Sequence, residues 1–154
     1  IKEEKIRHVF QKYVPKTVLE SFFANPEQAL IGENRILAVL FSDIRGFTSI
    51  SEKLRPDEMV ESLNEYFARM VNVVMSPERE GLVDKYIGDA IMAIFGAPKR
   101  HEDDALRSVL AALEMLDALE GFNEWQAQKG RSPFRIGIGI NYGNVTVGKS
   151  FTIN

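Results

Sequence analysis

The sequence contains no cysteine and only two histidines, His8 and His101, among its 154 residues. Without cysteine the chain can have no disulfide, no thiolate zinc site and no cysteine nucleophile. The two histidines lie far apart and show no metal-ligand spacing. A metal ion bound by this chain would therefore be held by oxygen atoms, which favours Mg²⁺ or Mn²⁺.

The chain also has little net charge and no long apolar run. Its formal net charge is −3, and no basic stripe with interleaved aromatic residues is present, so we expect no nucleic-acid partner. No apolar run approaches the roughly 20 residues that cross a bilayer, and no signal-peptide pattern is present. The first residue is not methionine. We therefore interpret the sequence as a cytoplasmic piece of a longer protein, such as the cytosolic output domain of a membrane-bound or multidomain regulator.

Residues 1–30 are interpreted as a linker that precedes a single domain over residues 31–154. Residues 1–24 have helical spacing, and Pro15 breaks or restarts that helix. Two interpretations stay open: an amphipathic capping helix, or the end of a coiled coil that couples an upstream sensor module to the domain.

The first half of the domain predicts a buried strand followed by a helix. Residues 36–43 form a nearly unbroken apolar run of strand length. Gly46 and the serine and threonine residues after it end the strand. Pro56 opens a helix, with two acidic residues after it in the first turn. The apolar stripe of this helix, which we expect to face the core, comprises Met59, Val60, Leu63, Phe67, Met70, Val71 and Val74.

The second half predicts a hairpin, a second helix and further strands. Residues 82–87 and 90–95 read as strands joined by a tight turn at Gly88-Asp89. A long helix opens with acidic residues and carries regularly spaced leucines up to Leu119. Residues 134–141 alternate as a strand does. Gly143-Asn144 then indicates a second turn, and residues 145–147 the start of another strand.

This order of elements predicts the fold class. Strand, helix, hairpin, helix and strand form a βαββαβ core. We expect an α+β ferredoxin-like sandwich, with helices packed on one face of an antiparallel-rich sheet and an N-terminal linker helix.

Asp43 and Asp89 are the candidate catalytic carboxylates. Asp43 ends the first strand, and Asp89 occupies the tip of the hairpin. If the hairpin flanks that strand, the carboxylates meet at one edge of the sheet, where two anions repel unless a cation lies between them. Taken singly, each aspartate also suits the local hydrogen bonds of a turn.

Two further features lie beside these aspartates. The loop after Asp43 contains Gly46, Phe47 and Thr48, whose backbone N–H groups could face an anion, or which could form an ordinary strand-to-helix loop. Lys85 alternates with apolar Val83 and Ile87, which places it on a largely apolar face. Lysine at this position either prevents an exposed edge strand from pairing with another chain or donates a hydrogen bond to a buried ligand.

Five blocks of the sequence closely resemble the signatures of class III adenylyl and guanylyl cyclases, over about residues 30–148. They are residues 41–48 (FSDIRGFT), 63–67 (LNEYF), 84–93 (DKYIGDAIMA), 101–105 (HEDDA) and 137–141 (GIGIN). The segment of residues 10–15 is similar to the one that joins sensor modules to bacterial cyclase domains.

The resemblance implies a mechanism and a set of site residues. Asp43, Asp89 and the Ile44 carbonyl match the metal ligands of the family, which uses two ions, Mg²⁺ or Mn²⁺, in each site. The residues around Gly46, Phe47 and Thr48 match the backbone that holds the triphosphate. The implied reaction is attack of the 3′-hydroxyl of ATP on the α-phosphorus, which yields cyclic AMP and pyrophosphate.

Lys85 matches the family position that reads the base. A lysine there donates to adenine, whereas guanylyl cyclases that resemble this pattern carry glutamate, so Lys85 favours ATP over GTP. The family is dimeric, with metals bound by one subunit and the base by the other. We therefore expect a homodimer with composite active sites, in which Lys85 and Asp89 serve opposite sites.

The resemblance weakens at the C-terminal end. Family members continue into a helix whose asparagine and arginine orient the ribose and stabilise the transferring phosphate, whereas this sequence stops at Asn154. We therefore expect a truncated domain that binds metal but turns over weakly or not at all.

Three alternatives to an adenylate cyclase are considered for this sequence. One is a catalytically silent cyclase-like module that only dimerises or senses nucleotide, and another is a guanylate cyclase. A diguanylate cyclase is disfavoured, because residues 87–91 lack the Gly-Gly-acidic-Glu-Phe hairpin that such an enzyme needs.

Overall fold

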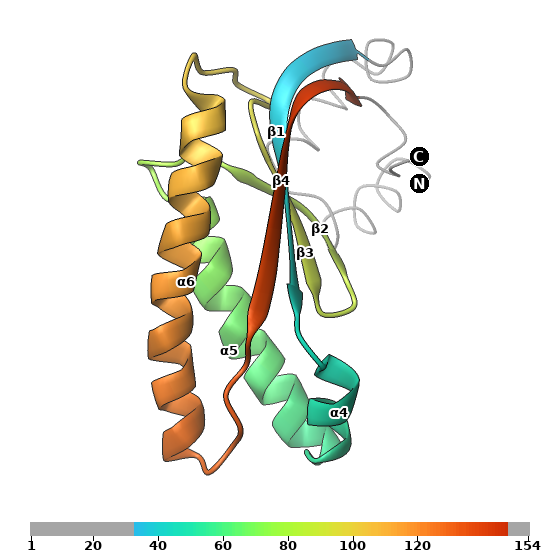
Figure 1. The fold of residues 1–154 in the computed structure, drawn as a ribbon, viewed down its shortest axis with the longest axis vertical. Coiled ribbons are helices and arrows are strands. Elements are labelled where there is room, and N and C mark those ends of the chain that lie inside the picture. Colours follow the sequence, from blue (N-terminus) through green and yellow to red (C-terminus); the bar gives the residue numbers. More distant parts are fainter. Residues whose placement is uncertain (1–32, 148–154) are drawn as a thin grey trace, which may run out of the picture.

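A computed structural model describes residues 33–147 of the chain. The elements follow in the order strand, two helices, hairpin, helix and strand (Figure 1). They are β1 (Glu33–Ile44), α4 (Phe47–Glu52), α5 (Pro56–Val74), β2 (Leu82–Ile87), β3 (Ala90–Phe95), α6 (Asp104–Gln128) and β4 (Ile136–Val147). The expected linker helix within residues 1–30 lies outside the described residues.

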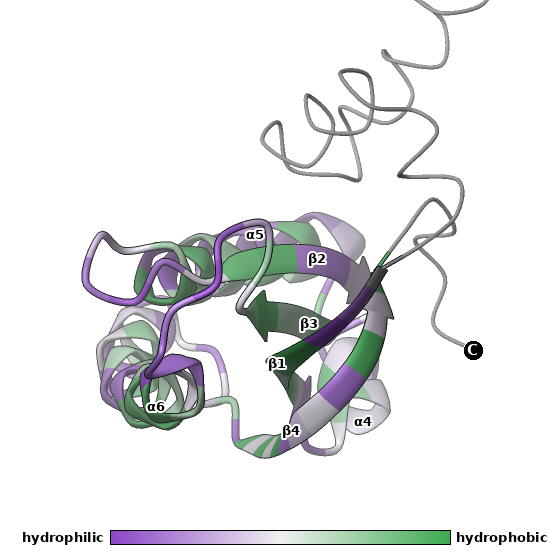
Figure 2. Cartoon of the chain, turned by 90° about the horizontal axis from the view of Figure 1, so that it is seen from above, coloured by the Kyte–Doolittle hydropathy of each residue, from purple (hydrophilic) through white to green (hydrophobic). Residues whose placement is uncertain are grey.

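The four strands form one sheet in the order β2-β3-β1-β4, and every neighbouring pair is antiparallel. Helices α5 and α6 lie together on one side of this sheet, as both views show (Figures 1 and 2). The predicted α+β class and the helices on one face are confirmed. The predicted hairpin strands have the bounds expected from the sequence.

The prediction of a turn at Gly143-Asn144 was wrong. β4 continues through both residues, with Gly143 opposite Leu37 and Asn144 opposite Ile36 on β1. The ladder between β1 and β4 runs without interruption from the Glu33–Val147 pair to the Ile44–Ile136 pair. Because a long antiparallel partner supplies hydrogen bonds all along the strand, it overrides a local turn preference worth about 1 kcal/mol or less.

The main hydrophobic core lies between the sheet and the two long helices. The residues of β1 that point towards the helices include Ala38, Leu40 and Ile44. An aromatic group fills the centre, where the Tyr66 ring lies 5.6 Å from Phe122 and 5.8 Å from Phe134, centroid to centroid. Such tilted and edge-on ring pairs add stability beyond the area that they bury.

The predicted stripe of α5 is confirmed at Met70 and Val74, which are fully buried, and at Leu63, Phe67 and Val71, which pack against the core, but not at Val60. The helix begins at Pro56, as expected, and the Arg55 backbone N–H donates to Glu58 Oε1 over 3.0 Å. Its fully buried residues are Ser62, Tyr66, Met70 and Val74, whereas Val60 is 55% exposed. The fully buried residues lie four apart because α5 packs against the sheet and against α6, which lies beside it on the same face.

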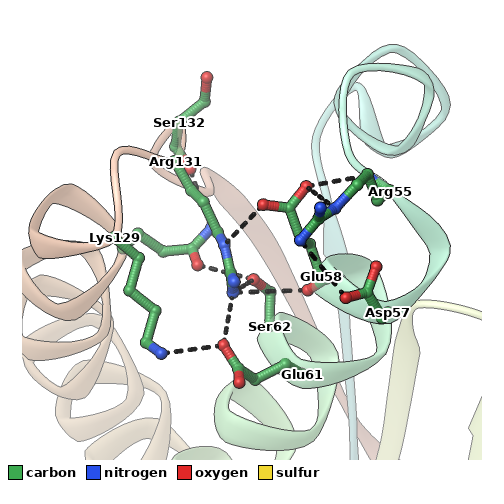
Figure 3. A network of polar contacts seen from close by, with 9 residues as sticks. Arg55, Asp57, Glu58, Glu61, Ser62, Lys129, Arg131 and Ser132 are labelled. Atoms are coloured by element: carbon green, nitrogen blue, oxygen red, sulfur yellow. Dashed lines mark hydrogen bonds and ion pairs between the residues drawn. The ribbon is translucent and has the colours of Figure 1, made fainter.

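A polar network joins the start of α5 to the end of α6 (Figure 3). The Ser62 hydroxyl donates to Gln126 Oε1 over 2.7 Å, and Arg131 Nη1 donates to the Ser62 hydroxyl over 3.0 Å. Arg131 Nη1 also lies 2.9 Å from Glu61 Oε1, which pairs with Lys129 Nζ over 3.0 Å. This network fixes the segment that leads from α6 into β4.

The opposite face of the sheet carries a smaller apolar cluster. Its buried members are Leu37, Val39, Leu82, Met92, Ile94 and Ala97. Within residues 33–147, no helix has the length and apolar character that spanning a membrane requires.

Candidate active site

Asp43 and Asp89 come to the same end of the sheet. The ladder between β1 and β3 ends at the Ser42–Ile91 pair, so the Gly88-Asp89 turn that joins β2 to β3 lies beside Ile44. Asp89 Oδ2 accepts a hydrogen bond of 2.9 Å from the Ile44 backbone N–H. The turn is tight because Gly88 adopts a φ of 62°, a left-handed conformation that favours glycine.

The carboxylate of Asp43 is open to solvent. Its side chain is 58% exposed, and its ion pair with Arg45 is long, with 3.9 Å between Asp43 Oδ1 and Arg45 Nε. Exposed pairs of this kind contribute between roughly zero and 1 kcal/mol. Asp43 therefore does little for folding, and its oxygens remain accessible to a cation.

Two buried hydroxyls lie beneath these carboxylates. Tyr66 and Ser42 are 0% and 2% exposed; their two hydroxyls interact, but neither makes a hydrogen bond of normal geometry within the described part of the chain. Burial raises the pKa of Tyr66 to about 12; the negative charges of Asp89 and Asp43 add to the rise, and the Ser42 hydroxyl opposes it. Both carboxylates thus act electrostatically on one buried hydroxyl.

The oxygen donors at this end of the sheet fit a hard divalent cation. Among residues 33–147, no group of three or more histidine, aspartate or glutamate side chains is arranged to hold a metal. Mg²⁺ is commonly held by one or two carboxylates and completes its octahedron with water and substrate phosphates. A pair of aspartates beside a solvent-open space suits that mode of binding.

Gly46, Phe47 and Thr48 begin a short helix directly after β1. Gly46 precedes α4 with a φ of 61°, and a Cβ there would meet nothing within 4 Å, so its glycine is needed for the backbone conformation. The Gly46 carbonyl accepts a 3.1 Å hydrogen bond from Ile50 N. Phe47 packs against the main core, which anchors the loop, and Thr48 is exposed.

The expected setting of Lys85 was partly wrong. A β-bulge lies between Val83 and Lys85: Val83 pairs with Ala93, and Lys85 pairs with Met92. Val83 therefore faces the helices, and Lys85 points to the other face of the sheet. Its Nζ lies 3.6 Å from Asp84 Oδ2, and β3 separates its strand from that of Asp43.

Four residues near the aspartates were not predicted from the sequence as their neighbours: Ser42, Tyr66, Arg45 and Gly137. Tyr66 carried a signal, because it is a polar aromatic residue beside the apolar stripe of α5. Gly137 carried none, since its role depends on a partner strand far away in the sequence.

Comparison with known proteins places these observations in a family. Residues 32–150 match the family model described as the adenylate and guanylate cyclase catalytic domain. The adenylate cyclase of Anabaena cylindrica is 36% identical over 154 residues, which cover 96% of this chain and 29% of that protein. The chain therefore spans less than a third of the length of that relative.

Two solved structures are similar in fold and sequence. The crystal structure of the guanylyl cyclase Cya2 gives a TM-score of 0.73 at 45% identity, over 76% of this chain and 58% of the other. The adenylyl cyclase CyaB from P. aeruginosa gives a TM-score of 0.70 at 35% identity, over 76% of this chain and 60% of the other.

Proposed function

The chain belongs to the family of adenylate and guanylate cyclase catalytic domains, and from that premise we propose that it is the catalytic domain of an adenylate cyclase. The proposed reaction converts ATP to 3′,5′-cyclic AMP and pyrophosphate. The observation that carries the proposal is that Asp43 and Asp89 lie at the same end of the sheet, where Asp89 is hydrogen-bonded to the N–H of Ile44, the residue after Asp43. The similarity to adenylate cyclases supports the same reading.

The aspartates and the Ile44 carbonyl are the proposed metal ligands. Two Mg²⁺ or Mn²⁺ ions bound there would neutralise phosphate charge and acidify the ribose 3′-hydroxyl. Asp89 is oriented by the Ile44 N–H, so that one of its oxygens stays fixed and the other is left to coordinate. The backbone of Gly46, Phe47 and Thr48 is proposed to bind the triphosphate, held in place by the packing of Phe47.

Lys85 is proposed to select the base. Its ammonium can donate to a ring nitrogen of adenine, and a buried donor facing the wrong base costs about 1–3 kcal/mol. Exchange of the donor for an acceptor in Lys85→Glu should therefore shift preference from ATP towards GTP. An unchanged ratio of the two kcat/KM values would remove Lys85 from this role.

A guanylate cyclase is the second candidate, because the match to the guanylyl cyclase Cya2 has higher identity than the match to CyaB. The same measurement separates the two candidates. Production of cyclic GMP in preference to cyclic AMP by the unaltered chain would favour the guanylate cyclase.

We propose further that the domain acts as a homodimer with composite sites and that residues 1–30 connect it to an upstream sensor. Lys85 on β2 and Asp43 on β1 are separated by β3, which supports their use in different sites. The family match begins at residue 32, which supports the division of the chain.

Mixing two impaired variants tests the dimer. Asp43→Asn and Lys85→Ala should each be far less active with ATP than the unaltered chain, and an equal mixture should recover about a quarter of the activity, since half of the dimers then carry one intact site of two. Failure of the mixture to recover activity, despite normal activity of the unaltered chain, would contradict composite sites.

The activity itself is tested with the chain and its Asp43→Asn variant, assayed for cyclic AMP with ATP and Mn²⁺. We expect weak production of cyclic AMP at most, and the product that forms should depend on both the metal and Asp43. Calorimetric titration with Mn²⁺ and ATP runs in parallel: binding without product would instead identify a nucleotide-binding module that is catalytically silent.

A further inference from the structure

The side chain of Arg45 lies across the backbone of Gly137. A Cβ atom built on Gly137 would be 2.6 Å from Arg45 Cζ and 2.7 Å from Arg45 Nε, so only glycine leaves room for the guanidinium in this position. Gly137 pairs with Asp43 in the ladder between β1 and β4. The missing side chain on β4 therefore leaves room for a cation beside the candidate metal ligand.

The backbone of Arg45 is held as well. Its N–H donates to the Arg135 carbonyl over 2.7 Å, and the next residue, Gly46, is fixed in a left-handed conformation. Arg45 is thus held at its main chain by the segment before β4, and its exposed side chain rests on the backbone of Gly137. Its guanidinium lies over Gly137 of β4, with Nε 3.9 Å from Asp43 Oδ1.

Folding stability does not account for this arrangement. The Arg45–Asp43 pair measures 3.9 Å, and the two side chains are 68% and 58% exposed, so the pair contributes little. Most N–H groups of the guanidinium remain available to another acceptor. A planar guanidinium fork matches the oxygens of a phosphate better than other cationic side chains do.

We propose that Arg45 binds the polyphosphate of the substrate and that Gly137 positions it. Arg45 lies in sequence between the proposed metal ligands and the proposed triphosphate-binding backbone, and its cation offsets the negative charge of Asp43 and Asp89 towards an incoming polyanion. This inference rests on the proposed function, and it adds a side-chain contact to a site otherwise made of carboxylates and backbone.

The proposal predicts two affinities that move in opposite directions. Loss of the guanidinium removes a phosphate donor, so polyphosphate binding should weaken. The same loss removes a positive charge beside Asp43, so Mn²⁺ alone should bind equally well or more tightly. Damage to the fold of the site would weaken both.

Calorimetry with Mn²⁺ alone, and with inorganic tripolyphosphate in the presence of Mn²⁺, tests this with the chain itself. Arg45→Ala should weaken tripolyphosphate binding by about tenfold, the loss of one charge-assisted hydrogen bond. Arg45→Lys should give a smaller loss, because the charge remains and the fork does not. The matched control is Arg100→Ala, which removes the same charge from an exposed side chain elsewhere.

Gly137→Ala tests the positioning role. Its Cβ would displace the guanidinium without removing its charge, and tripolyphosphate affinity should fall by several-fold, less than in Arg45→Ala. Gly139→Ala is the control on the same strand and face, because a Cβ there meets nothing within 4 Å. Thermal melting of both variants shows whether the strand has been disturbed. If Gly137→Ala does not fold, Arg45→Lys and Arg45→Ala still decide the proposal.

Several outcomes would overturn the inference. They are equal tripolyphosphate affinity in Arg45→Ala and the unaltered chain, a parallel loss of Mn²⁺ binding, or no tripolyphosphate binding at all. The proposed function is judged separately by cyclic AMP production. Tripolyphosphate binding that depends on Arg45 without any cyclisation would support this contact and would identify this chain as a catalytically silent nucleotide-binding module.

Discussion

Two polar regions of the molecule differ in whether their charged side chains are paired with other side chains of the protein. In the network between α5 and α6, Arg131 is only 11% exposed, and the hydrogen bonds from Lys129 and Arg131 lower the pKa of Glu61. At the end of the sheet, Asp43 is exposed and loosely paired, and the Tyr66 hydroxyl beneath it is buried without a hydrogen bond. Charges that are paired within the chain stabilise the fold, whereas charges left unpaired are available to a ligand.

Asp43→Asn should have the largest effect, and it tests whether the end of the sheet binds metal. We expect Mn²⁺ affinity to fall by at least about 100-fold, because a neutral amide replaces a charged ligand. The melting temperature should barely change, since the carboxylate is exposed. Calorimetry and thermal melting measure the two quantities. Asp57→Asn, which alters another exposed carboxylate, is the control; equal Mn²⁺ affinity in the two variants would refute the metal role of Asp43.

The buried hydroxyl of Tyr66 should make the stability of the protein depend on pH in the alkaline range. The folded-state pKa of Tyr66 is raised from 10.0 to about 12, so its contribution to stability is complete below pH 10 and is lost as the pH rises towards 12. Two pH units correspond to about 2–3 kcal/mol. Tyr66→Phe should abolish this alkaline loss, whereas Tyr142→Phe, at a residue 48% exposed, should keep it. Denaturant unfolding at several pH values checks the prediction, which fails if Tyr66→Phe unfolds with the same alkaline profile as the unaltered chain.

Arg131→Ala tests the network. Loss of its bonds to Ser62 and Glu61 should cost about 2 kcal/mol of the free energy of unfolding, or a fall of roughly 4–8 °C in melting temperature. Mn²⁺ affinity should not change. Arg55→Ala removes an arginine that is 74% exposed and should cost less than about 1 kcal/mol. A fall in Mn²⁺ affinity with unchanged stability in Arg131→Ala would reverse the assignment of the two regions.

The smallest expected effect concerns a second paired cluster, around His101. His101 Nε2 lies 2.6 Å from Glu80 Oε2, and this hydrogen bond lowers the pKa of Glu80. The stability it contributes is present above the ordinary pKa of 4.5 and is lost as the pH falls through the lowered value. Glu80→Gln should therefore show a shallower acid loss of melting temperature than the unaltered chain. Glu52→Gln, at an exposed residue, should follow the unaltered chain.

Most of the fold could be predicted from local patterns. Alternating and continuous apolar runs located the strands, and Gly88 before Asp89 located the hairpin turn. Asp43 and Asp89 could be selected from the sequence because one ends an apolar strand and the other lies at the tip of a hairpin, where packing of the core does not require a carboxylate. Their roles as metal ligands remain a prediction. The buried hydroxyls of Ser42 and Tyr66 could not be foreseen, because their isolation depends on what packs around them.

The sequence by itself determined which segments become strands and helices, and the residue types that can serve as donors at the end of β1. Only the tertiary structure decided that β4 continues through Gly143, that a bulge turns Lys85 away from the face of Val83, and that Arg45 lies on Gly137. Local preferences are worth about 1 kcal/mol or less for each residue. A ladder of twelve residues or a shared core combines many such contributions. Their total therefore determines the face of the sheet to which each side chain points.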